Sequence, residues 1–269
     1  MKNLVFCYVC MIFCAYHLYG KNTIAYAAPG LWYDGFVTSM TSQKISEPTR
    51  FQITWDDKNL YVVIDMHGKH LRRNKEYKYR PGIWPKTESV EIFLDTAGTK
   101  QSYFQIVASK DGIHWDSRTK RNPEYWKNVK WRAENIIDED GHWKMRFILP
   151  FDAQGMRRPV IGDTWYFNVC RNVVDGLTAT AATWADVGRK FQNPSKFAAL
   201  AFGTPAQYKA VKEQKIRKEL NKVKSRAKKC KTDTAFQERV RQVEKALSAL
   251  QVTALSDELE ILETIDKIK

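Results

Sequence analysis

The chain has 269 residues, is 43% hydrophobic and carries a formal net charge of +14. This length and hydrophobic content are enough for one or two domains with a real core. Three of the five cysteines lie within the first fourteen residues, and the other two, Cys170 and Cys230, are far apart. This cysteine pattern excludes a small disulfide-stapled scaffold and a cysteine-rich zinc domain.

The first twenty residues resemble an export signal. Lys2 supplies a positive start, and an apolar run over 4–16 is too short to cross a bilayer. We expect cleavage after Gly20; cleavage after Ala27 and an uncleaved anchor are the alternatives. The signal predicts a secreted, periplasmic or cell-surface protein without a transmembrane segment, and leaves Cys170 and Cys230 as free thiols.

Residues 22–205 contain short runs in which apolar and polar side chains alternate. The clearest runs cover 60–66, 90–94, 104–108 and 143–149, and the acidic turns 56–59 and 138–141 separate others. A period of two buries one face of each strand. Several such strands, without a matching number of helices, predict a mostly β protein: an antiparallel, jelly-roll-like β-sandwich followed by a helical tail.

Residues 206–269 form a basic tail, in which we expect two to three helices. Eleven Lys or Arg residues between 206 and 231 face only two glutamates, a net charge of +9. The apolar residues recur at spacings of three and four, and Thr234 is a candidate cap for the second helix. We expect a solvated basic face rather than nucleic-acid binding, and the tail could contact another chain.

Four segments, taken together with their order and spacing, form a specific sequence pattern: 51–62, 87–95, 162–171 and 182–202. They include Val-Glu-Ile-Phe-Leu-Asp, Trp-Tyr-Phe-Asn-Val-Cys-Arg and Ala-Thr-Trp-Ala-Asp. In this respect residues 51–202 resemble a family 9 carbohydrate-binding module. The resemblance implies non-catalytic binding of a xylan- or cellulose-like polysaccharide or oligosaccharide, in association with extracellular carbohydrate catabolism. It also implies a structural calcium ion, although no complete ligand set can be identified and the metal stays unassigned.

Two tryptophans of such modules sandwich a sugar ring, and by resemblance they correspond to Trp84 and Trp184. Both stand on polar or proline-flanked segments, as contact residues do; the alternative is that both pack under loops. By the same resemblance, hydrogen bonds to the sugar are assigned to four polar side chains: Glu91, Gln105, Asn168 and Arg171. Successive side chains of a strand alternate between its two faces, and Asn168 and Arg171 are three positions apart, so they lie on opposite faces. Arg171 could therefore form a structural ion pair instead.

We expect no enzymatic activity. A glycosidase needs two carboxylates across a cleft, whereas Glu88 and Glu91 should face opposite sides of a strand. A haem-binding sandwich of the DOMON type is one alternative, with Met66 and His67 as candidate axial ligands. These two residues are adjacent in a strand and point to opposite faces, so they cannot ligate one iron. The other alternative is a scaffold that works through its basic tail. His67 and His70 are expected to be isolated surface histidines.

Overall fold

The structure is a computed structural model, and it describes residues 24–67, 88–110, 112–119, 123–125, 131–137, 142–152, 156–175, 178–227, 238 and 241. The chain divides into two compact units. The first comprises residues 1–158 and 164–200, and the second comprises 159–163 and 201–269.

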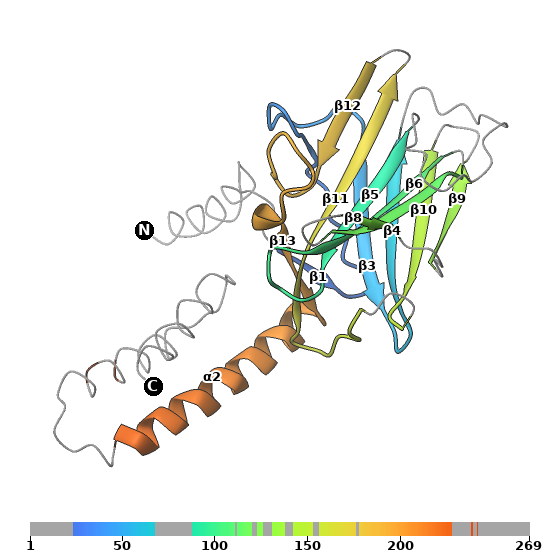
Figure 1. The fold of residues 1–269 in the computed structure, drawn as a ribbon. Helices are drawn as coiled ribbons and strands as arrows, with labels where there is room; N and C mark the ends of the chain where they lie inside the picture. Colours follow the sequence, from blue (N-terminus) through green and yellow to red (C-terminus); the bar gives the residue numbers. More distant parts are fainter. Residues whose placement is uncertain are drawn as a thin grey trace, which may run out of the picture. The chain divides into compact units, whose positions relative to one another are not determined.

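Two sheets built from the described strands make a sandwich, which confirms the predicted fold class (Figure 1). The larger sheet has the order β1-β13-β11-β5-β6-β7-β8, with β12 on β11 and β2 on β12. The smaller has the order β3-β4-β10-β9, and all its pairings are antiparallel. The strand bounds are β1 Ile24–Ala27, β2 Val37–Thr38, β3 Thr49–Trp55, β4 Asn59–His67, β5 Ser89–Asp95, β6 Tyr103–Ser109, β7 His114–Thr119, β8 Pro123–Tyr125, β9 Arg132–Ile137, β10 His142–Pro150, β11 Thr164–Asp175, β12 Thr178–Thr183 and β13 Ala198–Phe202.

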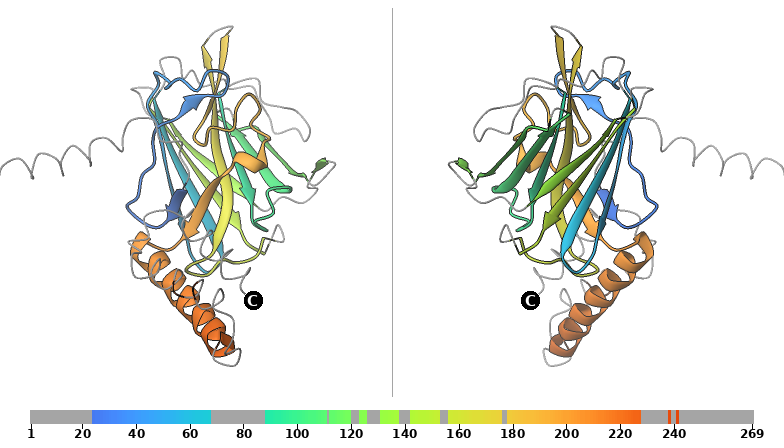
Figure 2. Two further views of the ribbon diagram at one scale, coloured as in Figure 1. Left: turned by 90° about the vertical axis from the view of Figure 1, so that its left-hand side faces the viewer. Right: turned by 90° about the vertical axis from the view of Figure 1, so that its right-hand side faces the viewer.

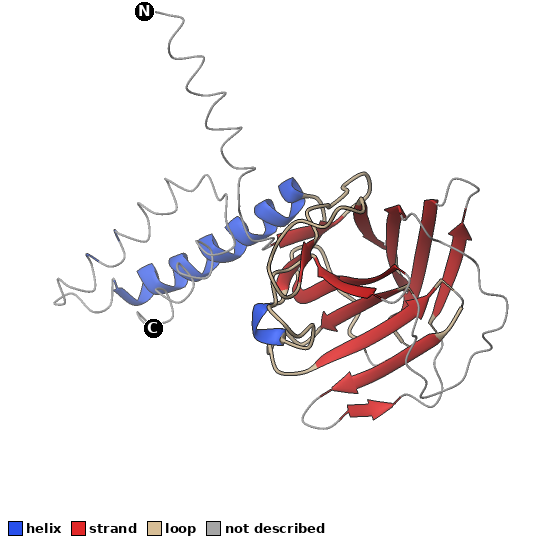
Figure 3. Cartoon of the chain, turned by 90° about the horizontal axis from the view of Figure 1, so that it is seen from above, coloured by secondary structure: helices blue, strands red, loops and turns tan. Residues whose placement is uncertain are grey.

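The core lies between the two layers of strands (Figure 3). Strand β4 follows the predicted alternation, because Leu60, Val62 and Ile64 are fully buried while the residues between them are half-buried. Trp143 on β10 and Trp165 on β11 are also fully buried. These are the largest apolar side chains available, so their burial contributes strongly to stability.

Strands β5 and β6 are buried on both faces, which a simple two-layer sandwich does not require. The segment around the 3-10 helix η1 (Pro194–Lys196) covers part of their outer face. Phe197 lies 5.6 Å from Phe93 and 5.7 Å from Tyr103, measured between ring centroids. Part of the outer face of the larger sheet is therefore a second, smaller apolar core.

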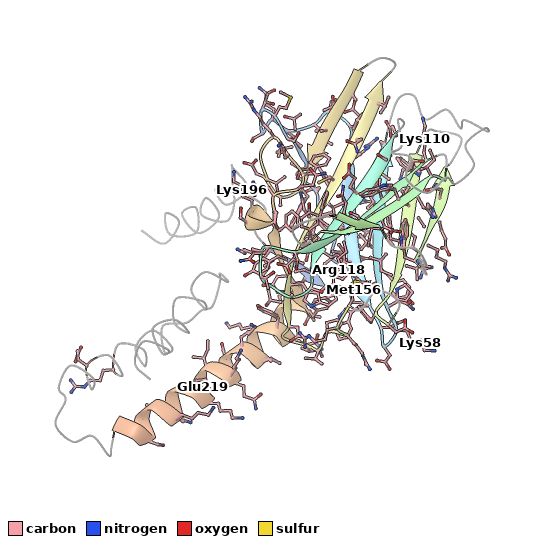
Figure 4. The ribbon with its side chains drawn as sticks, viewed as in Figure 1. Lys58, Lys110, Arg118, Met156, Lys196 and Glu219 are labelled. Atoms are coloured by element: carbon pink, nitrogen blue, oxygen red, sulfur yellow. The ribbon has the colours of Figure 1, made fainter. Side chains whose placement is uncertain are left out.

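The β11–β12 hairpin extends beyond the neighbouring strands in both views of Figure 2. Lys58, in the β3–β4 turn, and Lys110, after β6, mark opposite ends of the sandwich (Figure 4). Strand β5 begins at the Lys110 end, since the amide of Lys110 bonds the carbonyl of Glu88. Strand β4 starts beside Lys58 and therefore runs toward the Lys110 end.

The second unit contains helix α2 (Pro205–Ala227). Thr204 and Gln207 form a reciprocal capping box at its start: the Gln207 amide donates to Thr204 Oγ1 at 3.2 Å, and the Thr204 amide donates to Gln207 Oε1 at 2.9 Å. The helix is rich in lysine and arginine, as predicted for this part of the tail. The cap at Thr234, the later helices, Cys230 and the signal at 1–20 lie outside the described residues. Among the described helices, none is long and apolar enough to cross a membrane.

Candidate functional site

A polar cluster interrupts the apolar outer face of the larger sheet. Glu91 on β5 stands directly across from Val107 on β6 and from Cys170 on β11. Gln105 and Asn172 are its diagonal neighbours on these same two strands. Because directly paired residues share a sheet face, all five side chains lie on one side of the sheet.

Two amides hold the carboxylate of Glu91. Gln105 Nε2 donates to one oxygen at 2.9 Å, and Asn172 Nδ2 donates to the other at 2.8 Å. Asn172 Nδ2 also donates to Ser89 Oγ at 3.1 Å. Burial raises the pKa of Glu91 from its ordinary 4.5 to about 7, although the bonds from Asn172 and Gln105 act in the opposite direction. Strongly shifted carboxyl groups of this kind concentrate at functional sites.

Strand β7 adds an aromatic ring and a hydroxyl to this face. Trp115 is paired with Val107, and Ser117 with Gln105. Trp115 is half-buried, whereas the Ser117 hydroxyl is buried and has no hydrogen-bond partner among the described residues. From the usual strand spacing, Trp115 lies two strands, or about 10 Å, from Glu91. We call Ser89, Glu91, Gln105, Trp115, Ser117 and Asn172 the polar face.

Trp184 does not belong to the polar face, and the prediction that its ring is exposed on a polar loop is wrong. The side chain is only 3% exposed. Its ring lies 5.1 Å from that of Phe51 and 5.2 Å from that of Phe167, and its Nε1 donates to the carbonyl of Asp34 at 2.9 Å. The polar residues that flank Trp184 along the chain provide no sign that remote aromatic residues cover its ring. A ring so enclosed cannot offer a face to a sugar.

The structure places Arg171 and Asn168 on opposite sheet faces, as strand parity requires. Arg171 points into the sandwich and is fully buried. It donates to Glu88 Oε2 at 3.1 Å, to Thr49 Oγ1 at 2.8 Å and to the carbonyl of His67 at 3.0 Å. Arg171 therefore forms a structural ion pair with Glu88, which was the alternative to a sugar contact. The prediction that Arg171 binds the sugar is wrong.

Asn168 lies on the same face as Glu91 but is used internally. Its Nδ2 donates to Thr183 Oγ1 at 2.7 Å, and its Oδ1 accepts from the amide of Ala185 at 2.9 Å. These bonds hold the segment that follows β12, so Asn168 positions the chain next to Trp184. Its geometry does not direct it toward a ligand.

Trp84, the other candidate stacking residue, lies outside the described residues, so its role stays a prediction.

Glu88 and Glu91 point to opposite faces of the larger sheet, as expected. Glu88 bonds the inward-facing Arg171, while Glu91 bonds amides on the outer face. They cannot act as the paired carboxylates of a glycosidase.

The acidic turn at Asp56 and Asp57 does not fit a calcium ion. Asp56 Oδ1 accepts from the amides of Lys58 and Asn59, and its Oδ2 accepts from the hydroxyl of Tyr61 at 2.7 Å. Asp57 pairs with Arg158. These bonds engage both carboxylate oxygens of Asp56 and one of Asp57, which disfavours their use as calcium ligands. The turn at Asp138 lies outside the described residues, so calcium stays a prediction from resemblance.

The positions of Met66 and His67 exclude them as the two axial ligands of a haem iron. Met66 is fully buried between the sheets, whereas His67 is exposed on the outer face of the smaller sheet. The pair cannot ligate one iron. The same residue, His67, lies beside His142, so the prediction that it is an isolated surface histidine is wrong.

A pocket of about 660 Å³ lies at the Lys58 end of the sandwich, lined among others by Asp57, Pro150 and Arg158. Among its described lining residues the one aromatic, Phe151, is only 4% exposed. The described lining therefore offers no accessible ring, in contrast to the polar face with Trp115.

Neither Asn172 nor Trp115 was predicted from the sequence as a candidate binding residue. The spacing of Asn172 from Glu91 carries no signal, since strand register alone joins them. Trp115 sits in a run, His-Trp-Asp-Ser-Arg-Thr, whose alternation is too weak to show which face is outward.

A β-sandwich with buried polar groups and a half-buried tryptophan on one outer face has the architecture of a ligand-binding module. The chain belongs to the carbohydrate family 9 binding domain-like family, whose model matches residues 28–202. The expected family is thus confirmed. Comparison with curated proteins gave no match.

Several solved structures resemble the chain, among them the following three. A putative carbohydrate-binding protein from Bacteroides uniformis is 13% identical, with a TM-score of 0.53, over 64% of this chain and 86% of that chain. Two family 9 carbohydrate-binding modules from Caldicellulosiruptor kristjanssonii were solved with cellotriose and with glucose. They are 14% and 16% identical, with TM-scores of 0.48 and 0.47, and cover 67% of this chain and 92% and 95% of theirs.

Proposed function

We propose that the protein binds an oligosaccharide or polysaccharide at Trp115 and Asn172, the two half-buried members of the polar face, without transforming it. Family membership supports the class of ligand. The observation that carries the choice of surface is the Glu91 cluster, in which a buried carboxylate is held by two amides. Amide and carboxylate groups are the usual partners of sugar hydroxyls, and an aromatic ring suits the apolar face of a pyranose.

Asn172 is the member of the cluster best suited to meet the sugar. It is half-buried, and its Nδ2 group is engaged by Glu91 and Ser89. Its Oδ1 accepts no hydrogen bond within the described part of the chain, so it can accept one from a sugar hydroxyl. In this proposal Glu91, with Gln105 behind it, fixes the orientation of Asn172.

Trp115 supplies the stacking ring in place of Trp184. Asn172 and Trp115 stand three strands apart, which is roughly 14 Å by the usual strand spacing. This separation favours an oligosaccharide that crosses the strands over a single sugar. Trp84, by resemblance, is proposed as a second ring.

The finer proposals rest on the family. The ligand is proposed to be of the xylan or cellulose type, the protein to act in extracellular carbohydrate catabolism, and its location to be secreted, periplasmic or at the cell surface. Each of these three proposals, on ligand type, biological role and location, can be tested independently of the proposed binding surface.

Titration calorimetry with xylo- and cello-oligosaccharides tests the surface. Trp115→Ala should weaken binding by about 1–3 kcal/mol, by analogy with other stacked rings. Asn172→Ala should weaken it by about 1 kcal/mol, as for one hydrogen bond. Trp32→Ala and Asn221→Ala are matched controls, because Trp32 is 40% exposed beside Arg50 of the smaller sheet and Asn221 is exposed on α2.

Two outcomes would count against the proposal. The first is absence of binding to every tested oligosaccharide at millimolar concentration. The second is unchanged affinity in both Trp115→Ala and Asn172→Ala, which would move the site to another surface while leaving the ligand class intact.

A further inference from the structure

A group of three metal-ligating side chains lies on the outer face of the smaller sheet, opposite the face proposed for sugar. Asp65 and His67 come from the end of β4, and His142 begins β10. His142 is directly paired with His67, and the side chains of Asp65, His67 and His142 offer ligand atoms that all lie within 4.8 Å of one another. The pairing joins residues 75 positions apart, so no sequence motif marks the group.

The two imidazoles already share one orientation. Their rings are stacked, with centroids 4.5 Å apart and planes inclined by 28°. His142 Nε2 bonds Asp65 Oδ1. His67 is exposed and His142 is half-buried, so an ion can reach both from solvent.

Arg50 on β3 fixes the carboxylate of Asp65. Its Nε and one terminal nitrogen both donate to Asp65 Oδ2, at 3.0 and 2.8 Å. Asp65 Oδ2 is thereby occupied, and Oδ1 is left on the side of the histidines. The carboxylate is 3% exposed, so its position is set by Arg50 and His142 rather than by solvent. Outer partners that orient a ligand in this way are typical of metal sites.

We propose that Asp65, His67 and His142 bind one divalent transition-metal ion of the Zn²⁺ type. Two imidazoles and one carboxylate suit zinc and its neighbours, whereas calcium and magnesium prefer oxygen alone. Binding replaces the hydrogen bond between His142 Nε2 and Asp65 Oδ1 by bonds to the ion. A neutral His142 then carries its one ring proton on Nδ1, and a doubly protonated His142 releases one proton to solvent. The three ligands leave at least one coordination position for water.

The geometry requires a modest adjustment. Ligand atoms on one tetrahedral zinc are about 3.4 Å apart, given bonds of about 2.0–2.1 Å. No pair in the group therefore has to approach by more than about 1.5 Å, which a rotation of the exposed His67 can provide. The hydrogen-bonded atoms His142 Nε2 and Asp65 Oδ1 must move apart to admit the ion. Arg50 and Lys144, which is paired with Asp65, add positive charge nearby and weaken the site.

Calorimetric titration of the untagged full chain with zinc chloride tests the proposal. We expect one zinc per chain at this site and at least a tenfold loss of affinity in His67→Ala, whose side chain is exposed and so can be removed without opening a core cavity. His142→Ala should show the same loss. Lys144→Gln, which removes a positive charge from the same face, is the matched control and should bind at least as tightly as the unaltered chain.

Two further measurements separate this site from the cysteines elsewhere in the chain. Cobalt bound at Asp65, His67 and His142 should give visible bands without thiolate-to-metal charge transfer. Zinc should also raise the melting temperature of the unaltered protein and not that of His67→Ala. Equal zinc affinity in the unaltered chain and both histidine variants would overturn the proposal, as would a dissociation constant weaker than about 100 μM.

Discussion

The indole of Trp184 stands edge-on against the ring of Phe51, with centroids 5.1 Å apart and planes at 89°. Phe51 belongs to β3 of the smaller sheet, whereas Trp184 directly follows β12 of the larger one. This contact therefore joins the two layers. It explains why a tryptophan in a polar sequence is a core residue.

Trp184→Ala should destabilise the protein by about 3–5 kcal/mol, because it opens a cavity between Phe51 and Phe167 and removes the bond to Asp34. Chemical denaturation followed by fluorescence or circular dichroism measures the loss. Trp32→Ala, at an exposed ring, should change the free energy of unfolding by no more than about 1 kcal/mol. Equal effects of the two changes would contradict the core assignment.

Glu91 should make stability depend on pH. Its pKa is about 7 in the folded protein and 4.5 ordinarily, so the folded state holds the proton more tightly. The free energy of unfolding should fall as pH rises from about 4.5 to about 7, by about 3 kcal/mol, and level off above.

Urea denaturation at pH 5 and pH 8 checks this dependence. Glu91→Gln should lose most of the difference between the two pH values and be the more stable protein at pH 8. Glu134→Gln, at an exposed position on β9, is the control and should retain the wild-type difference.

Arg171→Ala should cost about 3–5 kcal/mol of stability, because it leaves the buried Glu88 without its ion-pair partner. Thr49 and the carbonyl of His67 lose a donor as well. The matched control is Arg158→Ala, which breaks an exposed pair with Asp57 and should change stability by less than about 1 kcal/mol. A melting curve of each variant decides, and similar small shifts would refute the buried-pair assignment.

Gly162→Ala should destabilise the second unit. Gly162 has a φ of +91°, and a Cβ added there would meet Val211 Cβ at 2.9 Å. Gly30→Ala is the control for strain alone, since Gly30 has a φ of +79° and nothing within 4 Å. It should cost about 1 kcal/mol, and Gly162→Ala clearly more.

A second substitution, Val211→Ala, isolates the steric part. It should recover part of the stability lost by Gly162→Ala in the double variant, as measured by thermal denaturation. No recovery would mean that backbone strain accounts for the whole effect.

Patterns within single strands were enough to predict much of the sandwich. The alternation over 60–66 gave β4 and its buried face, and strand parity separated Glu88 from Glu91 and Asn168 from Arg171. The physical reason is local: in an extended chain, neighbouring side chains must point to opposite sides. The segments that resemble the family likewise carried its identity.

Contacts between distant segments decided the sites. Trp184 is buried because Phe51 and Phe167 cover it, Asn172 reaches Glu91 through the β5–β11 register, and His142 meets His67 through the β4–β10 register. A loop residue has no period that reports its burial, and a pairing register depends on which strands become neighbours. The sequence by itself therefore determined the strands and the family, whereas only the tertiary structure decided which polar and aromatic side chains stand together.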